Sequence, residues 1–365
     1  MDMRHITADR LVDSTNGAAL LELLELLERQ VDVVEPFTEQ PWEDVCTRAD
    51  PERVRRAAEL AAELPLSRLL ELMLIASGEV GSFWDLDWIA ERLEHRHQRA
   101  AIAEVLVDRF DAAEMTVPGT GEQWWWTEGG WPTDGRLGEG LDEPGTWSRG
   151  TLPQRALMTT SVLPDAEGWI SFEQLITGSW DLCCGPSARW SLEVEPQRPI
   201  YEVNDADDWV ALVRRFPRVV AGAGVGDGME LVTRETGLWR RRRELAEFAR
   251  FEQRVPGQRY ASRSWLRFLS PDWEAVADDY SGVHLTWQGF LLADGTLSDL
   301  GDGDVTIRRN WGSERTLWMA PVVTRAEPLP IAADMLGADE PHARPVDSAD
   351  WATEHRQLMT FAGTA

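Results

Sequence analysis

The spacing of the apolar residues changes about a third of the way along this chain, and the change limits which folds the sequence can adopt. From about residue 16 to residue 115 the apolar residues recur at helical intervals, as in the run 54–64 that follows the helix-start signal Asp50-Pro51-Glu52. Beyond residue 150, short segments such as 190–194 alternate apolar and polar residues as strands do. We therefore predict an α+β protein, in which an N-terminal all-helical bundle is followed by a mixed α+β domain with a small, largely antiparallel sheet.

These patterns divide the chain into four parts. Residues 1–115 form the predicted helical domain, and residues 116–150 form a connector rich in tryptophan and glycine. Residues 151–320 form the α+β domain, and residues 321–365, which hold many Pro, Ala and Asp residues, form a C-terminal tail. The connector includes the run Trp124-Trp125-Trp126, whose indoles either pack against the neighbouring domain or line a ligand groove.

Local signals predict individual elements in the second domain. We expect strands at residues 157–163, 199–203, 282–287 and 315–319. The acidic segment 204–208 is typical of a capped helix start and predicts a helix over residues 209–216. Asp and Gly residues between 294 and 304 predict a hairpin that ends in the strand at residues 315–319.

The charge balance excludes some classes of partner. The formal net charge is −27, from 63 acidic residues against 36 basic residues, all of them arginine. An acidic chain is not expected to coat nucleic acid or to adsorb to an anionic membrane, because both need a basic surface. A small-molecule nucleotide in a local pocket, or a basic protein partner, fits this charge.

Compartment and metal content follow from what the sequence lacks. No run approaches 18 consecutive apolar residues, and the N-terminus has no basic region followed by an apolar core. Three cysteines, two of them adjacent, do not suggest a disulfide framework, so we expect a cytoplasmic protein. No paired His or Cys motif has the spacing of metal ligands, and no metal is predicted.

Three segments of the second domain carry polar side chains that could hold a dinucleotide. Arg155 precedes a segment that contains Thr159 and Ser161, and a guanidinium can bind a diphosphate. His284 and Thr286 lie on a second expected strand, where a hydroxyl could orient a ribose. Glu314 precedes a third strand, where a carboxylate could stabilise the ribosyl cation that forms as nicotinamide leaves NAD.

This order of arginine, Ser/Thr strand and glutamate resembles the mono-ADP-ribosyltransferase fold over about residues 151–320. The resemblance implies NAD as co-substrate and Glu314 as the catalytic residue. It implies these cofactor-binding residues: Arg155, Thr159, Ser161, His284, Thr286 and Trp311. The chain departs from the family in having Gly312 two residues before the glutamate, where the family has Gln or Glu. Because the Ser/Thr segment follows Arg155 so closely, Thr286 would have to serve as the central hydroxyl.

Two other interpretations stay open. Segments 273–286 and 311–318 also resemble uncharacterised bacterial proteins that carry a WExVAxxYxGVHLT segment, which implies a shared fold unit but no activity. The chain could be a non-catalytic acidic binding protein, immunity- or antitoxin-like, that occupies a basic partner through a contiguous acidic surface flanked by exposed tryptophan. In that case His284 is a hydrogen-bonded strand residue and Glu314 pairs with Arg308 or Arg309. A site within the connector is a further alternative.

Overall fold

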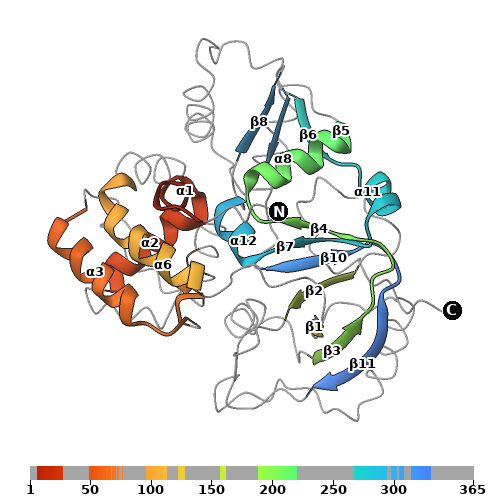
Figure 1. The fold of residues 1–365 in the computed structure, drawn as a ribbon, viewed down its shortest axis with the longest axis horizontal. Coiled ribbons are helices and arrows are strands. Elements are labelled where there is room, and N and C mark those ends of the chain that lie inside the picture. The colour runs from red at the N-terminus through yellow and green to blue at the C-terminus, as the bar shows by residue number, and fades with distance from the viewer. Residues whose placement is uncertain are drawn as a thin grey trace.

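A computed structural model shows helices together with two sheets, as expected for an α+β protein (Figure 1). The structure describes residues 6–27, 49–66, 68–70, 72–73, 76, 96–112, 122–127, 157–161, 188–219, 267–293, 297–301, 304–307 and 314–329. The larger sheet is mixed and largely antiparallel, in agreement with the predicted sheet.

The N-terminal region contains helices that pack against one another. They are α1 (Ala8–Asp13), α2 (Thr15–Leu27), α3 (Pro51–Glu63), the 3-10 helix η2 (Arg96–Arg99) and α6 (Ala100–Ala112). Helix α3 begins where the sequence indicates, because the Asp50 side chain accepts a hydrogen bond from the Glu52 amide. The apolar face of α3 packs on α6 and α2. A buried ion pair of 2.7 Å joins Arg99 of η2 to Glu25 of α2.

The central sheet has seven strands in the order β11-β3-β1-β2-β10-β7-β4. Their bounds are β1 (Glu122–Thr127), β2 (Leu157–Ser161), β3 (Ala188–Val194), β4 (Ile200–Val203), β7 (Gly282–Leu285), β10 (Arg315–Trp318) and β11 (Val323–Leu329). Neighbouring strands are antiparallel except β4 and β7, which are parallel.

Two of these strands lie outside residues 151–320, the range predicted for the α+β domain. Residues 122–127, assigned to the connector, form β1 between β3 and β2. Residues 323–329, assigned to the tail, form the edge strand β11 against β3. Both strands lie far in sequence from the strands they pair with, so local signals could not reveal the pairing.

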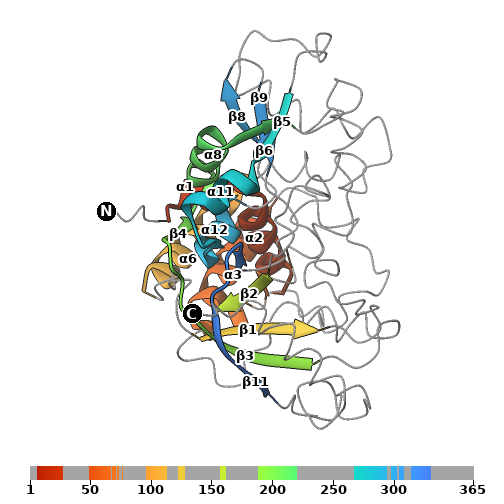
Figure 2. The ribbon, with the colours of Figure 1, turned by 90° about the vertical axis from the view of Figure 1, so that its right-hand side faces the viewer.

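A second sheet has four strands in the order β5-β6-β9-β8 and lies at the other end of the strand-containing region (Figure 2). Its members are β5 (Pro217–Val219), β6 (Arg267–Pro271), β8 (Leu297–Gly301) and β9 (Asp304–Ile307). The antiparallel pair β8–β9 forms a hairpin in the predicted region, but residues 315–318, in which the predicted hairpin ended, belong to the central sheet as β10. Helix α8 (Ala206–Arg215) follows the Asp205 cap, and helix α11 (Trp273–Asp279) precedes β7.

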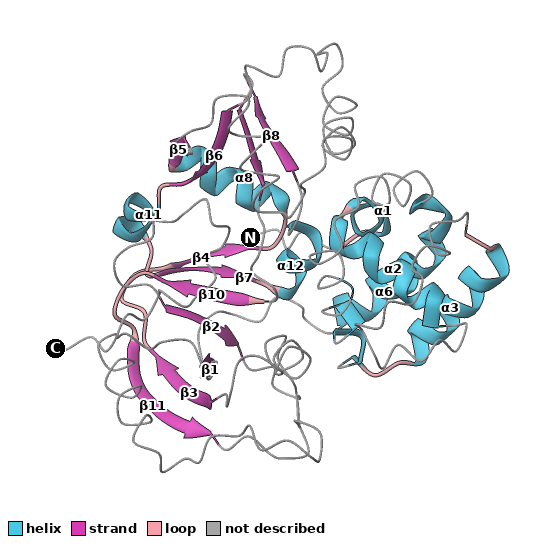
Figure 3. Cartoon of the chain, turned by 180° about the vertical axis from the view of Figure 1, so that it is seen from behind, coloured by secondary structure: helices cyan, strands magenta, loops and turns pink. Residues whose placement is uncertain are grey.

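The strand expected over residues 282–287 ends at Leu285, and helix α12 (Trp287–Ala293) follows. Helix α12 lies between the N-terminal helices and the central sheet (Figure 3), and all its residues are buried. Gly289 permits this packing, since a Cβ there would lie 1.9 Å from the Val203 carbonyl oxygen.

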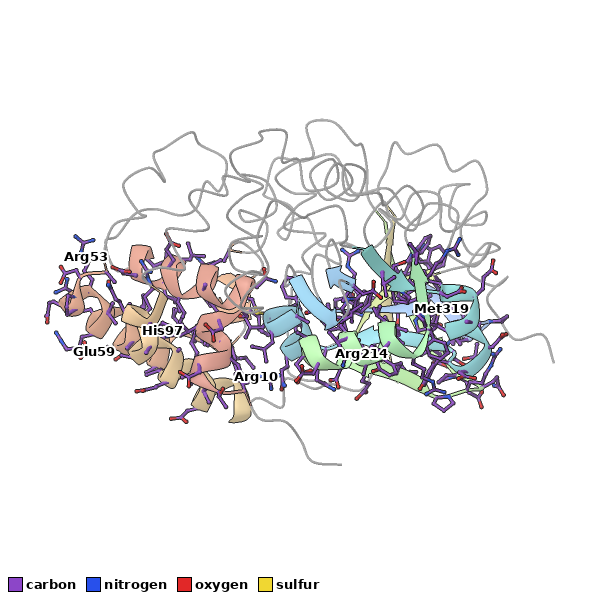
Figure 4. The ribbon with its side chains drawn as sticks, turned by 90° about the horizontal axis from the view of Figure 1, so that it is seen from above. Arg10, Arg53, Glu59, His97, Arg214 and Met319 are labelled. Atoms are coloured by element: carbon purple, nitrogen blue, oxygen red, sulfur yellow. The ribbon has the colours of Figure 1, made fainter. Side chains whose placement is uncertain are left out.

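Two side chains of the N-terminal helices tie them to the rest of the chain. Asn16 donates a hydrogen bond to the Phe290 carbonyl of α12 at 2.9 Å. Arg10, which lies where the helical part meets the strand-containing part (Figure 4), forms an ion pair with the fully buried Asp205. Since Asp205 also caps α8, one carboxylate joins α1 to the start of α8.

Candidate functional site

A row of polar side chains crosses one face of the central sheet. The strand register places Glu202 opposite His284, His284 opposite Thr316, and Thr316 opposite Thr159. Because side chains on a strand alternate between faces, these four share one face of β4, β7, β10 and β2. The other face carries apolar residues that pack in the main core, namely Val203, Val283, Leu285, Leu317 and Met158.

Tryptophan side chains form an apolar cluster beside this polar row. Trp318, Trp125 and Trp190 are buried together with neighbouring aliphatic residues. Trp318 donates from its indole Nε1 to the Thr159 hydroxyl at 2.8 Å, and that hydroxyl donates to the Gln123 side-chain oxygen at 2.7 Å. The indoles thus pack in the core, which is one of the two roles expected for the segment around Trp125.

Glu314 and His284 form a buried pair at the centre of the polar face. Glu314 precedes β10 and is 1% exposed, and its Oε1 lies 2.7 Å from Nε2 of the fully buried His284 on β7. The backbone amide of Ser161, the last residue of β2, donates to the Glu314 Oε2 at 2.9 Å. Contacts from both neighbouring strands therefore fix the orientation of this carboxylate.

His284 carries a positive charge at neutral pH. Burial acts to lower its pKa, but Glu202 and Glu314 oppose this and raise the pKa to about 9. Its Nε2–H therefore donates to Glu314 in a charge-assisted hydrogen bond. Its Nδ1 lies 3.9 Å from Oε1 of Glu202, which is close enough for an ion pair but too far for a hydrogen bond.

The structure brings together only part of the predicted site. His284, Glu314 and Ser161 converge, whereas Thr286 acts as the cap of α12: its hydroxyl accepts from the Gly289 amide at 3.0 Å and donates to Asn204. Thr159 lies on the polar face but is bonded to Gln123 and Trp318. The predicted residues Arg155 and Trp311, and the alternative partners Arg308 and Arg309, lie outside the described residues.

Sequence reasoning missed Glu202, Thr316 and Gln123. Each lies within a short strand, and alternation alone gives only the face on which it lies. The pairing of Glu202 with His284 depends on the parallel contact of β4 with β7, which residues 204–281 separate in sequence. The one available signal was that Glu202 and His284 are ionisable residues inside otherwise apolar strand segments.

Comparison of the chain with protein-family models, with curated proteins and with solved structures found no match. The function is therefore argued from the geometry of the site. Among the described residues no helix combines the length and the apolar character needed to cross a bilayer. In the same part of the chain no three His, Cys, Asp or Glu side chains are grouped as metal ligands, since Glu202 and Glu314 lie at opposite nitrogens of His284.

Proposed function

We propose that Glu314 is the catalytic carboxylate of an enzyme that cleaves the nicotinamide–ribose bond of NAD, as an ADP-ribosyltransferase or an NAD glycohydrolase does. The observation that carries this proposal is a carboxylate that is 1% exposed and oriented by His284 on one side and the Ser161 amide on the other. A preorganised carboxylate shielded from water is well suited to stabilise positive charge that develops in a transition state.

The proposed reaction needs little covalent chemistry from the protein. The bond between the ribose C1′ and the nicotinamide nitrogen breaks, and its electron pair leaves with neutral nicotinamide. The ribosyl cation is captured at C1′ by water or by a hydroxyl or amine of an acceptor, whose proton passes to solvent. Glu314 lowers the energy of the cation, and His284 keeps the carboxylate in position.

In this proposal Ser161, and not Thr286, supplies the hydroxyl that orients the ribose of the substrate. The Thr286 hydroxyl is engaged in capping α12 and bonds Asn204. Ser161 is partly exposed, lies beside Glu314, and accepts a hydrogen bond from Gln123 Nε2 at 3.0 Å. Because that bond uses the Ser161 oxygen only as an acceptor, its O–H can donate to a substrate hydroxyl.

The alternative of an acidic binding protein has the net charge of −27 in its favour. It requires a contiguous acidic surface flanked by exposed indoles. On α3 the exposed acids alternate with arginines, as Arg53 and Glu59 illustrate (Figure 4), and Glu52 pairs with Arg55. The described tryptophans of the core, such as Trp318, are buried. These observations favour the enzyme.

Nicotinamide release tests the proposal directly. The full chain is incubated with NAD, and free nicotinamide is quantified by chromatography for the wild type, Glu314→Gln and the control Glu327→Gln. Glu327 lies exposed on β11, at the far edge of the sheet. We expect Glu314→Gln to reduce release by about 100-fold or more, as loss of a single preorganised electrostatic contact does, and the control to match the wild type. Equal rates in wild type and Glu314→Gln, or no release, would overturn the proposal.

Two finer features belong to the same proposal. Residues 1–115 would fold as one helical bundle, which the mutual packing of α1, α2, α3 and α6 supports. The protein would act in the cytoplasm, which the composition of the chain supports through its few cysteines and its acidic charge. Limited proteolysis that yields a stable N-terminal fragment would test the first feature.

A further inference from the structure

Two buried polar atoms on the polar face lack a hydrogen-bond partner within the described part of the chain. They are Nδ1 of His284 and Oγ1 of Thr316, and both side chains are fully buried. The two residues sit directly opposite each other on β7 and β10. Buried polar groups in proteins are nearly always hydrogen-bonded, so two neighbouring groups without a hydrogen bond indicate a place for atoms of a bound molecule.

The chemistry of the neighbouring groups restricts what that molecule can be. The protonated imidazole presents an N–H donor at Nδ1, and the Glu202 carboxylate presents an acceptor 3.9 Å away. One hydroxyl that lies beside these two atoms can accept from the first and donate to the second. The Thr316 hydroxyl can bond a second hydroxyl on the adjacent carbon.

The charges and hydrogen-bond donors of these side chains exclude two other classes of ligand, namely phosphates and ammonium groups. Glu202 and Glu314 flank one imidazolium, so the cluster has a negative balance and would repel a phosphate. An ammonium group would be attracted, but it has no lone pair to accept from the Nδ1–H. A neutral group that both donates and accepts hydrogen bonds can bond His284 Nδ1, the Glu202 carboxylate and the Thr316 hydroxyl. Vicinal hydroxyls have this property.

We propose that Glu202, His284 and Thr316 form a hydroxyl subsite that binds the vicinal hydroxyls of a pentose. Its assignment to the nicotinamide ribose rests on the proposed function, whereas recognition of a pentose does not. Glu202 lies on the edge strand β4 and its side chain is 38% exposed, so this carboxylate is the part of the subsite that solvent reaches. His284 then uses its Nδ1 to contact the sugar and its Nε2 to contact Glu314. It thereby sets the distance between the pentose and the Glu314 carboxylate.

Equilibrium binding of a neutral sugar tests the subsite without any catalysis. The full chain, labelled with nitrogen-15 at histidine, is titrated with methyl β-D-ribofuranoside and separately with its 2-deoxy analogue, and the His284 imidazole resonances are followed. We expect the riboside to shift the Nδ1 resonance, and the deoxy analogue to bind about tenfold more weakly because it leaves a polar partner unpaired. Ribose 5-phosphate should bind no more tightly than the uncharged riboside.

Near-isosteric variants test whether Glu202 and Thr316 bind the riboside. Glu202→Gln and Thr316→Val should each weaken riboside binding by about tenfold, the effect expected from losing one hydrogen bond in a dry site. Glu327→Gln, a carboxylate of the opposite edge strand β11, should leave binding unchanged. Thermal unfolding of each variant shows that the fold is retained, and a variant that fails this check is replaced by Glu202→Asp or Thr316→Ser.

The outcomes separate this inference from the proposed function. Riboside binding that depends on Glu202 and Thr316 supports the subsite even if no nicotinamide is released. Nicotinamide release that depends on Glu314, with an unchanged KM for NAD in both subsite variants, overturns the subsite and leaves the function standing. If neither sugar shifts the His284 resonance at saturating concentration, the two unpaired atoms hold buried water only and the inference is wrong.

Discussion

The charge on His284 should make the stability of the folded chain depend on pH. Its pKa is raised from the ordinary 6.5 to about 9 in the folded state, because Glu202 and Glu314 together outweigh the effect of burial. Between these two values the folded chain holds a proton that the unfolded chain has released. The stabilisation is therefore complete below about pH 6.5 and is lost as the pH rises through 9.

The magnitude follows from the size of the shift. Each unit of pKa difference corresponds to about 1.4 kcal/mol, so the shift of His284 corresponds to a loss of about 3 kcal/mol between pH 6.5 and pH 9. We expect His284→Gln to remove this dependence, because glutamine does not titrate. The difference in unfolding free energy between wild type and variant should thus be largest at pH 6 and shrink steadily toward pH 9.

Urea unfolding followed by tryptophan fluorescence measures this difference at intervals from pH 6 to pH 9. Subtracting the variant from the wild type cancels the titration of the shared groups that do not interact with His284. His97→Gln is the matched control, because His97 is exposed on the N-terminal helices (Figure 4) and should leave the pH profile of the wild type intact. A constant difference between wild type and His284→Gln over the whole range would refute the reasoning.

Two further predictions concern helix α12. Thr286→Val removes the hydroxyl that accepts from the Gly289 amide, so we expect a loss of about 1 kcal/mol in stability with an unchanged KM for NAD. Normal thermal stability with a raised KM would instead place Thr286 in the substrate site. Gly289→Ala brings a Cβ to within 1.9 Å of the Val203 carbonyl oxygen, and we expect about 1–3 kcal/mol of destabilisation or more, seen as a lower melting temperature. An unchanged melting temperature for Gly289→Ala would show that this close approach does not restrict the position.

Local chemistry made several elements of the fold predictable. The cap at Asp205 and the acidic residues after it indicated helix α8, which the structure shows over Ala206–Arg215. Alternation indicated β3, and the Asp and Gly residues between 294 and 304 indicated a hairpin in the region of β8 and β9. Each of these signals acts between residues a few positions apart, so the sequence carries it explicitly.

Such local signals could not predict contacts between residues that lie far apart in the sequence. Thr286 caps residues 287–293, but these residues contain Gly289, which disfavours a helix, and their packing against α2 gives support that no local signal shows. His284 and Glu314 were both expected in the site, but their direct contact depends on the register between β7 and β10. A shift of this register by one residue would move His284 relative to its partners on β10, and no local feature sets it.

Helix α12 has a practical consequence for work on this protein. Its surface is covered in part by α2, and Asn16 binds its Phe290 carbonyl. A shortened polypeptide that begins after the N-terminal helices would lose the cover that α1 and α2 give to the apolar helix α12, and we expect such a fragment to self-associate on expression. Titrations with NAD or with a riboside are therefore best made on the full chain, in which α12 stays covered.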